Sequence, residues 1–186
     1  MMPVRVVGDS ITYYVAQYGG VDLFADRDLV ATIDGRPGAR ADSPTRWQRW
    51  IEAVDALVDT QGAAVYALGT NDVWKESHAD PDRHTDPDAR RFDDSELATC
   101  VAHVCRALTY SAVRGVWPVW VNVTERTLSG WYNGGARHLN AEMRDACTAN
   151  EWGHVDWNAL RAPTRDLVHP KPDGVRMWVD AVAEVI

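Results

Sequence analysis

The sequence predicts an α/β fold in which five parallel strands form a doubly wound sheet with helices on both faces. Apolar, β-branched runs alternate along the chain with amphipathic helical patterns, and there is no internal repeat. One run, residues 63–68, is almost entirely apolar, as expected for a central strand covered on both faces. The chain has 186 residues, 46% of them apolar, so we expect residues 1–186 to fold as a single domain.

The first two strands are expected over residues 4–7 and 29–33. The first ends at Gly8 and is followed by a helical pattern over residues 11–18, which gives a strand, a turn and a helix. The second ends at residues 34–38, where Asp, Gly and Pro favour a turn.

The next helix is expected to begin at Pro44, because Ser43 is a favourable N-cap and proline is favoured at the first helical position. Gly62 ends it and leads into the central strand. Its apolar side chains recur at helical spacing and predict a buried face: Trp47, Trp50, Ile51, Val54, Leu57 and Val58.

The second half of the chain continues this alternation. Asp93 and Glu96 have capping-box spacing at the start of a helix, and Pro118 predicts a bulge or an unpaired position in a strand over residues 115–123. The remaining expected elements are a weaker helix over residues 136–150, a short strand over 154–157 and a closing amphipathic helix over 175–186.

The charge balance excludes several classes of partner. Nineteen basic and 27 acidic side chains give a formal net charge of -8, which argues against nucleic acid and against a polybasic membrane contact. No apolar stretch approaches the roughly 20 residues needed to span a bilayer, and the chain begins with a strand pattern rather than a signal peptide. We therefore expect a protein that is cytoplasmic or otherwise not exported.

Three polar segments follow apolar runs or precede helices, and they contain the residues of a serine-esterase site: residues 8–10, 69–72 and 166–169. Parallel strands bring such segments to one edge of the sheet, where α/β proteins place their chemistry. A serine hydroxyl becomes a good nucleophile when an imidazole takes its proton and a carboxylate orients that imidazole. Ser10, His169 and Asp166 are the predicted nucleophile, base and orienting acid.

The attack on an ester creates an oxyanion, which needs hydrogen-bond donors already aimed at it. The predicted donors are the Ser10 backbone N–H, the side-chain amide of Asn71 and a glycine N–H from the loop after the second strand. Either Gly35 or Gly38 could supply that N–H, and we favour Gly38.

These ordered motifs resemble those of the SGNH hydrolases, the GDSL-like esterase and lipase family. The four matching blocks are residues 7–11, 35–38, 69–72 and 166–169. The resemblance implies a flavodoxin-like three-layer α/β/α sandwich and a cofactor-free, metal-free serine esterase. Its substrate would be a small-molecule or glycan ester, with a short acyl or acetyl group.

Three other functions remain open. Residues 155–157, with the Asp-His loop, also resemble SGNH domains attached to membrane acyltransferases, so the chain could be an O-acetyltransferase acting on a glycan. It could also be a noncatalytic SGNH-like binding module. A flavodoxin-like phospho-acceptor module that uses Asp9 is a further alternative.

Three residues are hypothetical substrate contacts. They are Asp9 beside the nucleophile, Trp74 just after Asn71, and Trp131 in a Gly-rich segment expected to be a loop. The polar segment 75–92 is expected to be a long loop beside the site that acts as a lid or a substrate wall.

Overall fold

The structure of the chain is a computed structural model that describes residues 1–41, 44–73, 94–127 and 130–186. For residues 44–47, 94–96 and 130–131 it describes the backbone alone. The elements in chain order are β1 (Met2–Gly8), α1 (Ser10–Gln17), α2 (Gly20–Ala25), β2 (Leu29–Gly35), α3 (Pro44–Asp55), β3 (Ala63–Ala67), α5 (Asp94–Ala112), β4 (Trp117–Val121), α6 (Gly130–Asn150), β5 (Gly153–Val155) and α7 (Pro172–Val185).

The predicted five-stranded parallel sheet is confirmed. The strand order is β2-β1-β3-β4-β5, and every neighbouring pair is parallel. This is the flavodoxin-like order of a doubly wound sheet. Because Gly8 is level with both Gly35 and Ala67, the carboxyl ends of β1, β2 and β3 lie side by side.

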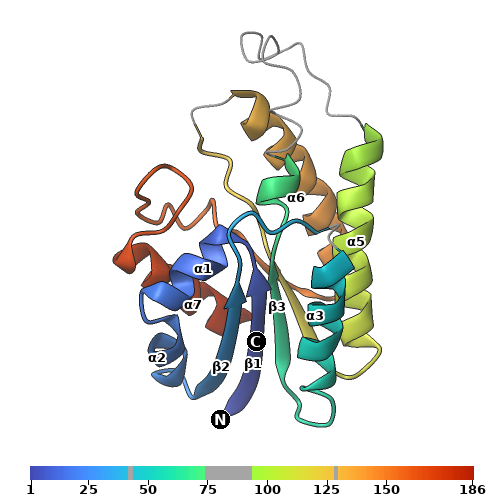
Figure 1. The fold of residues 1–186 in the computed structure, drawn as a ribbon, viewed down its shortest axis with the longest axis vertical. Coiled ribbons are helices and arrows are strands. Elements are labelled where there is room, and N and C mark those ends of the chain that lie inside the picture. Colours follow the sequence, from blue (N-terminus) through green and yellow to red (C-terminus); the bar gives the residue numbers. More distant parts are fainter. Residues whose placement is uncertain (42–43, 74–93, 128–129) are drawn as a thin grey trace.

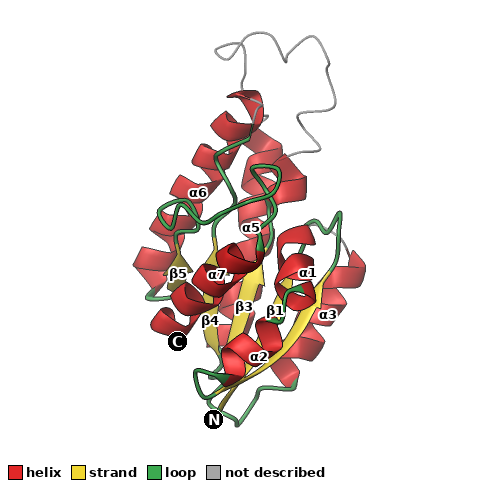
Figure 2. Cartoon of the chain, turned by 90° about the vertical axis from the view of Figure 1, so that its left-hand side faces the viewer, coloured by secondary structure: helices red, strands yellow, loops and turns green. Residues whose placement is uncertain are grey.

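Helices cover both faces of the sheet, as Figure 1 shows. One core contains side chains of α3, α5 and α6, and the other contains side chains of α1, α2 and α7. Figure 2 looks onto the face covered by α1, α2 and α7. Along β3, Tyr66 points into the first core and Val65 into the second, which is the alternation expected of a strand buried on both faces.

The described part of α3 confirms the predicted apolar face. Trp50 and Val54 are buried there and Leu57 lies just beyond the helix end, while Ile51 and Val58 are half-buried. The predicted N-cap, Ser43, lies outside the described residues, but the helix does begin at Pro44.

Two helices differ from the prediction. The sequence did not predict helix α2, because its six residues are too few to show a helical period. The helix is stabilised by packing of buried Phe24, whose ring centroid is 6.4 Å from that of Trp178. The helix α6 begins at residue 130 rather than near 136, since packing of buried Tyr132 and Ala136 outweighs the low helix propensity of the glycines between them.

The strands β4 and β5 also have different bounds from the prediction. The strand β4 ends at Val121, and β5 covers residues 153–155 instead of 154–157. Pro118 causes no bulge, because the register between β3 and β4 is continuous; pairing with β5 begins one residue later, at Val119. Among the described residues, no helix is both long and apolar enough to cross a membrane.

Candidate active site

Ser10 lies at the carboxyl end of β1, where the strand turns directly into a helix. It is the first residue of α1, and Asp9 caps that helix by accepting a hydrogen bond at Oδ1 from the backbone N–H of Ile11 at 2.9 Å. A Cβ on Gly8 would lie 2.7 Å from the carbonyl oxygen of Ala67, so glycine is needed for β1 and β3 to approach at this point. The sharp turn leaves Ser10 partly exposed at the sheet edge.

The structure brings Ser10, His169 and Asp166 into one chain of hydrogen bonds. The Nε2 atom of His169 is 2.9 Å from the Ser10 Oγ, and its Nδ1 atom is 2.6 Å from the Asp166 Oδ2. Nε2 therefore faces the hydroxyl while Nδ1 faces the carboxylate. In Figure 1 the loop between β5 and α7, which carries both residues, lies beside α1.

The loop that carries the histidine is fixed by its own hydrogen bonds. The Oδ1 atom of Asp166 accepts the backbone N–H groups of His169 at 2.8 Å and Val168 at 3.2 Å. Leu167, which lies between Asp166 and Val168, has a left-handed backbone with φ 67°. Its carbonyl accepts a hydrogen bond from the Thr124 hydroxyl at 3.3 Å. These contacts position the imidazole before any substrate arrives.

The carboxylate of Asp166 is stabilised in its charged form. Partial burial acts to raise its pKa, but the hydrogen bonds from the His169 ring and from the two backbone N–H groups outweigh burial, and the pKa lies below the usual value. Asp166 therefore presents a charged acceptor to Nδ1 at neutral pH.

Two of the three predicted oxyanion donors, Gly38 and Asn71, lie on neighbouring loops of the same sheet edge. Residues 36–39 form a turn, in which Ala39 N–H bonds to the Arg36 carbonyl at 2.9 Å and Gly38 has φ 75°. Proline and then glycine at the two central positions is the pattern of a type II turn. The Arg36 N–H bonds to the Gly8 carbonyl at 3.0 Å, which holds this turn beside the strand that leads to Ser10.

The second loop is the helical turn at residues 70–73 that follows β3. Asn71 donates from Nδ2 to the Ala39 carbonyl at 2.9 Å, and Asp72 accepts the Ala41 N–H at Oδ2, at 3.0 Å. Because an amide group has two N–H donors, the bond to Ala39 leaves Asn71 one more. These contacts join the loops of β2 and β3 into one unit.

Asp9 is completely buried, which is inconsistent with the predicted substrate contact and with the phospho-acceptor alternative. Its Oδ1 caps α1, and its carboxylate also interacts with the side chain of Thr70. Burial raises the pKa of Asp9 to about 6, although the Ile11 N–H acts to lower it. Asp9 is a structural support for the turn that carries Ser10.

Two further hypotheses concerned tryptophans. Trp131 lies in the first turn of α6, which corrects its prediction as a loop residue, and the neighbouring Tyr132 is buried. Trp74 and the segment 75–92 lie outside the described residues.

Sequence reasoning missed two side chains beside the histidine. The Tyr14 ring centroid is 4.9 Å from that of His169, and Arg165 bonds to the Tyr14 hydroxyl at 3.3 Å. A signal for Tyr14 was available, because a residue four positions after Ser10 lies on the same helical face. Nothing local in the sequence indicates Arg165, which is 151 positions from Tyr14.

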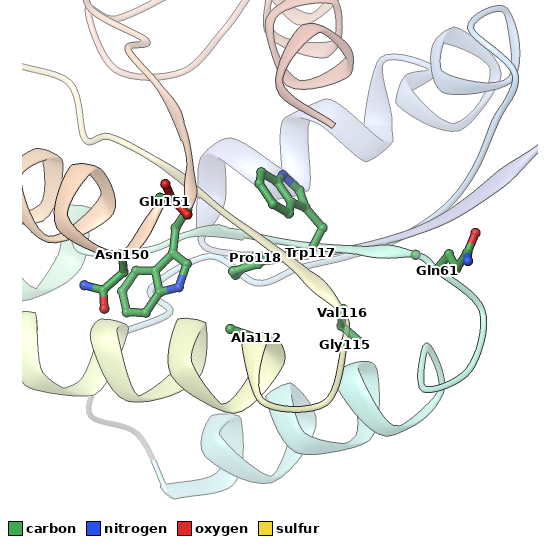
Figure 3. A pocket seen from close by; sticks show the side chains of 10 residues that line it. Gln61, Ala112, Gly115, Val116, Trp117, Pro118, Asn150 and Glu151 are labelled. Atoms are coloured by element: carbon green, nitrogen blue, oxygen red, sulfur yellow. The ribbon is translucent and has the colours of Figure 1, made fainter.

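A pocket of about 390 Å³, shown in Figure 3, has none of these residues in its lining. Its lining includes Gln61, Trp117 and Glu151, which stand before or at the start of β3, β4 and β5. In a parallel sheet this is the edge opposite Ser10. The described residues contain no group of three or more side chains that could hold a metal ion.

Comparisons with known proteins agree with this architecture. A family model described as the GDSL-like Lipase/Acylhydrolase family matches residues 6–177. No curated protein sequence matches the chain.

Several solved structures share the fold. A GDSL-like lipase from Bacteroides thetaiotaomicron has a TM-score of 0.73 at 16% identity, with 98% of this chain and 86% of that chain covered. A catalytic mutant of the acetylxylan esterase Axe2 from Geobacillus stearothermophilus has a TM-score of 0.71 at 16% identity, with coverage of 98% and 93%. A member of the lipolytic protein G-D-S-L family from Veillonella parvula has a TM-score of 0.70 at 16% identity, with coverage of 100% and 98%.

Proposed function

This chain belongs to the GDSL-like Lipase/Acylhydrolase family, and we propose that it hydrolyses carboxylic esters of short acyl groups through an acyl-Ser10 intermediate. The observation that carries the proposal is the hydrogen-bonded chain from Ser10 Oγ through His169 to Asp166, with distances of 2.9 and 2.6 Å. This order is the one that converts a serine hydroxyl into a nucleophile.

The first half of the proposed reaction forms the acyl-enzyme. Ser10 Oγ attacks the ester carbonyl carbon as its proton passes to Nε2 of His169, and Asp166 stabilises the resulting imidazolium at Nδ1. When the tetrahedral intermediate collapses, the carbon–oxygen bond to the alcohol breaks, and Nε2 returns the proton to the leaving alcohol oxygen. In the second half, water takes the place of the alcohol and attacks the acyl carbon as it loses a proton to Nε2. When this intermediate collapses, the bond from the acyl carbon to Ser10 Oγ breaks, Nε2 returns the proton to Ser10 Oγ, and the carboxylic acid is released.

The oxyanion of each half-reaction would be held by the Ser10 N–H, the Gly38 N–H and the Asn71 amide. Ser10 is the first residue of α1, where backbone N–H groups have no partner within the helix and the helix dipole favours negative charge. The bonds from Asn71 to Ala39 and from Arg36 to Gly8 support the other two donors by keeping their loops at the same edge.

The acyl group is proposed to be acetyl and the alcohol a carbohydrate. Support comes from the shared fold of the acetylxylan esterase Axe2, although at 16% identity that likeness concerns the fold. An O-acetyltransferase would use the same acyl-enzyme and differ only in the acceptor, so an assay with a sugar acceptor present separates the two activities by their products.

The test uses p-nitrophenyl acetate, butyrate and octanoate with the wild type and Ser10→Ala, together with a fluorophosphonate label located by mass spectrometry. We expect hydrolysis to favour acetate, to fall at least 10³-fold in Ser10→Ala, and the label to lie on Ser10. Ser111, which is fully buried and bonded to Tyr66, is an internal control that should not react. Equal rates in the two proteins and an unlabelled Ser10 would indicate a noncatalytic module.

A further inference from the structure

The mechanism places the alcohol part of the ester on a defined side of Ser10. Because Nε2 of His169 returns a proton to the leaving oxygen, that oxygen has to lie within hydrogen-bond distance of Nε2. The rest of the alcohol then extends over the surface next to the imidazole. Among the described side chains, Tyr14 lies next to the imidazole, and Arg165 contacts the Tyr14 hydroxyl.

Two tyrosines of α1 and its C-cap residue, Tyr18, lie outside the buried face of the helix. Its buried residues are Ile11, Thr12 and Val15. Tyr13 and Tyr18 are each 37% exposed, and Tyr14 is half-buried. The helix therefore presents aromatic rings to solvent immediately beside the site.

The three rings form one continuous cluster. Tyr14 and Tyr18, four positions apart, stack with ring centroids 5.9 Å apart and an interplanar angle of 24°. Tyr13 contacts Tyr14 edge-on, with centroids 5.6 Å apart. The cluster thus extends from His169, through Tyr14, to Tyr18 at the far end of the helix.

Arg165 gives this aromatic surface a polar border. Its Nη1 is 3.3 Å from the Tyr14 hydroxyl, and its guanidinium carbon is 5.4 Å from the centre of that ring. A guanidinium has five N–H donors, so one that holds the Tyr14 hydroxyl retains donors for other hydroxyl groups. The surface therefore offers flat apolar area and hydrogen-bond donors side by side.

This combination fits the chemistry of a sugar ring. A pyranose presents a face of C–H groups that packs on aromatic rings, while its hydroxyls need hydrogen-bond partners. A small alkyl alcohol would use neither feature fully. Tyrosine serves such a ligand well, because its ring is apolar and its hydroxyl is polar.

We propose that Tyr14, Tyr18 and Arg165 form the subsite for the sugar ring whose ester is cleaved at Ser10. This inference rests on the proposed function, because it takes His169 as the group that protonates the leaving alcohol. Tyr18 is the residue to test, since Tyr14 also contacts His169 and its removal would disturb catalysis directly.

The experiment compares two acetate esters, a mono-acetylated methyl pyranoside and ethyl acetate. An aryl ester is unsuitable, since its own ring could stack on the tyrosines. In Tyr18→Ala the ratio of the KM for the pyranoside to the KM for ethyl acetate is expected to rise by about three- to tenfold. Arg165→Met should raise the same ratio. Tyr18→Leu, which keeps an apolar side chain, is the second variant if Tyr18→Ala folds poorly.

The matched control is Tyr110→Ala on α5. Tyr110 also pairs with an arginine, Arg114, whose guanidinium carbon is 3.4 Å from its ring centre, but it lies near the opposite edge of the sheet. Its replacement should leave the KM ratio unchanged. An unchanged ratio in Tyr18→Ala and Arg165→Met, with both esters still hydrolysed, would overturn the subsite. Failure of the wild type to hydrolyse either ester would overturn the proposed function itself, and the subsite with it.

Discussion

The side-chain amide of Asn71 donates a hydrogen bond to the backbone carbonyl of Ala39 at 2.9 Å. The bond joins the loop after β3 to the loop after β2, and Asp72 strengthens the connection by accepting the Ala41 N–H at 3.0 Å. Asn71 consequently has two proposed tasks, one as a donor to the oxyanion and one as an anchor for the loop that contains Gly38.

Asn71→Ala is expected to lower kcat by about 10²–10³-fold, the usual effect of removing one oxyanion donor. Asp72→Ala removes a loop anchor and leaves the Asn71 amide in place, so it separates the two tasks. We expect its loss of kcat to be about tenfold smaller than that of Asn71→Ala. Steady-state kinetics on acetate esters measures both. Equal losses would assign Asn71 to loop anchoring alone.

Asp9 is expected to make the stability of the protein depend on pH. Its pKa is about 6 in the folded chain, against a reference value of 3.8. The folded state therefore binds this proton more tightly than the unfolded state. Asp9 stabilises the fold fully only below its unfolded pKa, and that contribution is lost as the pH rises through 6, at a cost on the order of 3 kcal/mol.

Asp9→Asn keeps the Oδ1 acceptor for the Ile11 N–H and removes the charge. Urea unfolding should show this variant to be more stable than the wild type at pH 7.5, with the difference shrinking steadily between pH 6 and pH 4. Asp145→Asn is the surface control, because the Asp145 side chain is 82% exposed. A difference that stays constant with pH would contradict an ionised, buried Asp9.

Glu151 stands at a helix end where glycine is normally found. The N–H of Trp152 bonds to the Cys147 carbonyl at 2.9 Å and that of Glu151 to the Thr148 carbonyl at 3.4 Å, which is the Schellman pattern, and Glu151 has φ 56°. The end of α5 has the same pattern with Gly115, at φ 72°. Glu151 and Gly115 both line the pocket in Figure 3.

Glu151→Gly is expected to raise the free energy of unfolding by about 1 kcal/mol, because it relieves the left-handed strain and removes a negative charge from a helix C-terminus. Glu151→Ala removes only the charge and should gain a few tenths of a kcal/mol. Gly115→Ala should have the opposite effect and lose about 1 kcal/mol, although its Cβ would meet no atom within 4 Å. Denaturant unfolding of the three variants checks these signs, and no gain in Glu151→Gly would mean that Glu151 is unstrained.

The sequence by itself determined the fold class and the family. The apolar runs that became β1 and β3, and the helical stripe around Trp50 and Val54, are local patterns that survive in the structure: the runs are continuous, and the stripe has a period of 3.6 residues. The ordered motifs predicted the family whose model matches residues 6–177. The sequence did not predict the short helix α2 or the glycine-containing start of α6, because packing of buried Phe24 and Tyr132 stabilises these helical turns.

The tertiary structure alone decided which side chains meet. Ser10 and His169 are 159 positions apart, and their contact depends on the strand order and on the loop after β5. Folding also buried Asp9, which the sequence analysis had predicted to contact the substrate. It brought Tyr14 and Arg165 together next to the imidazole. Local sequence governs backbone conformation over a few residues, whereas burial, pKa and long-range contacts arise only when the layers pack.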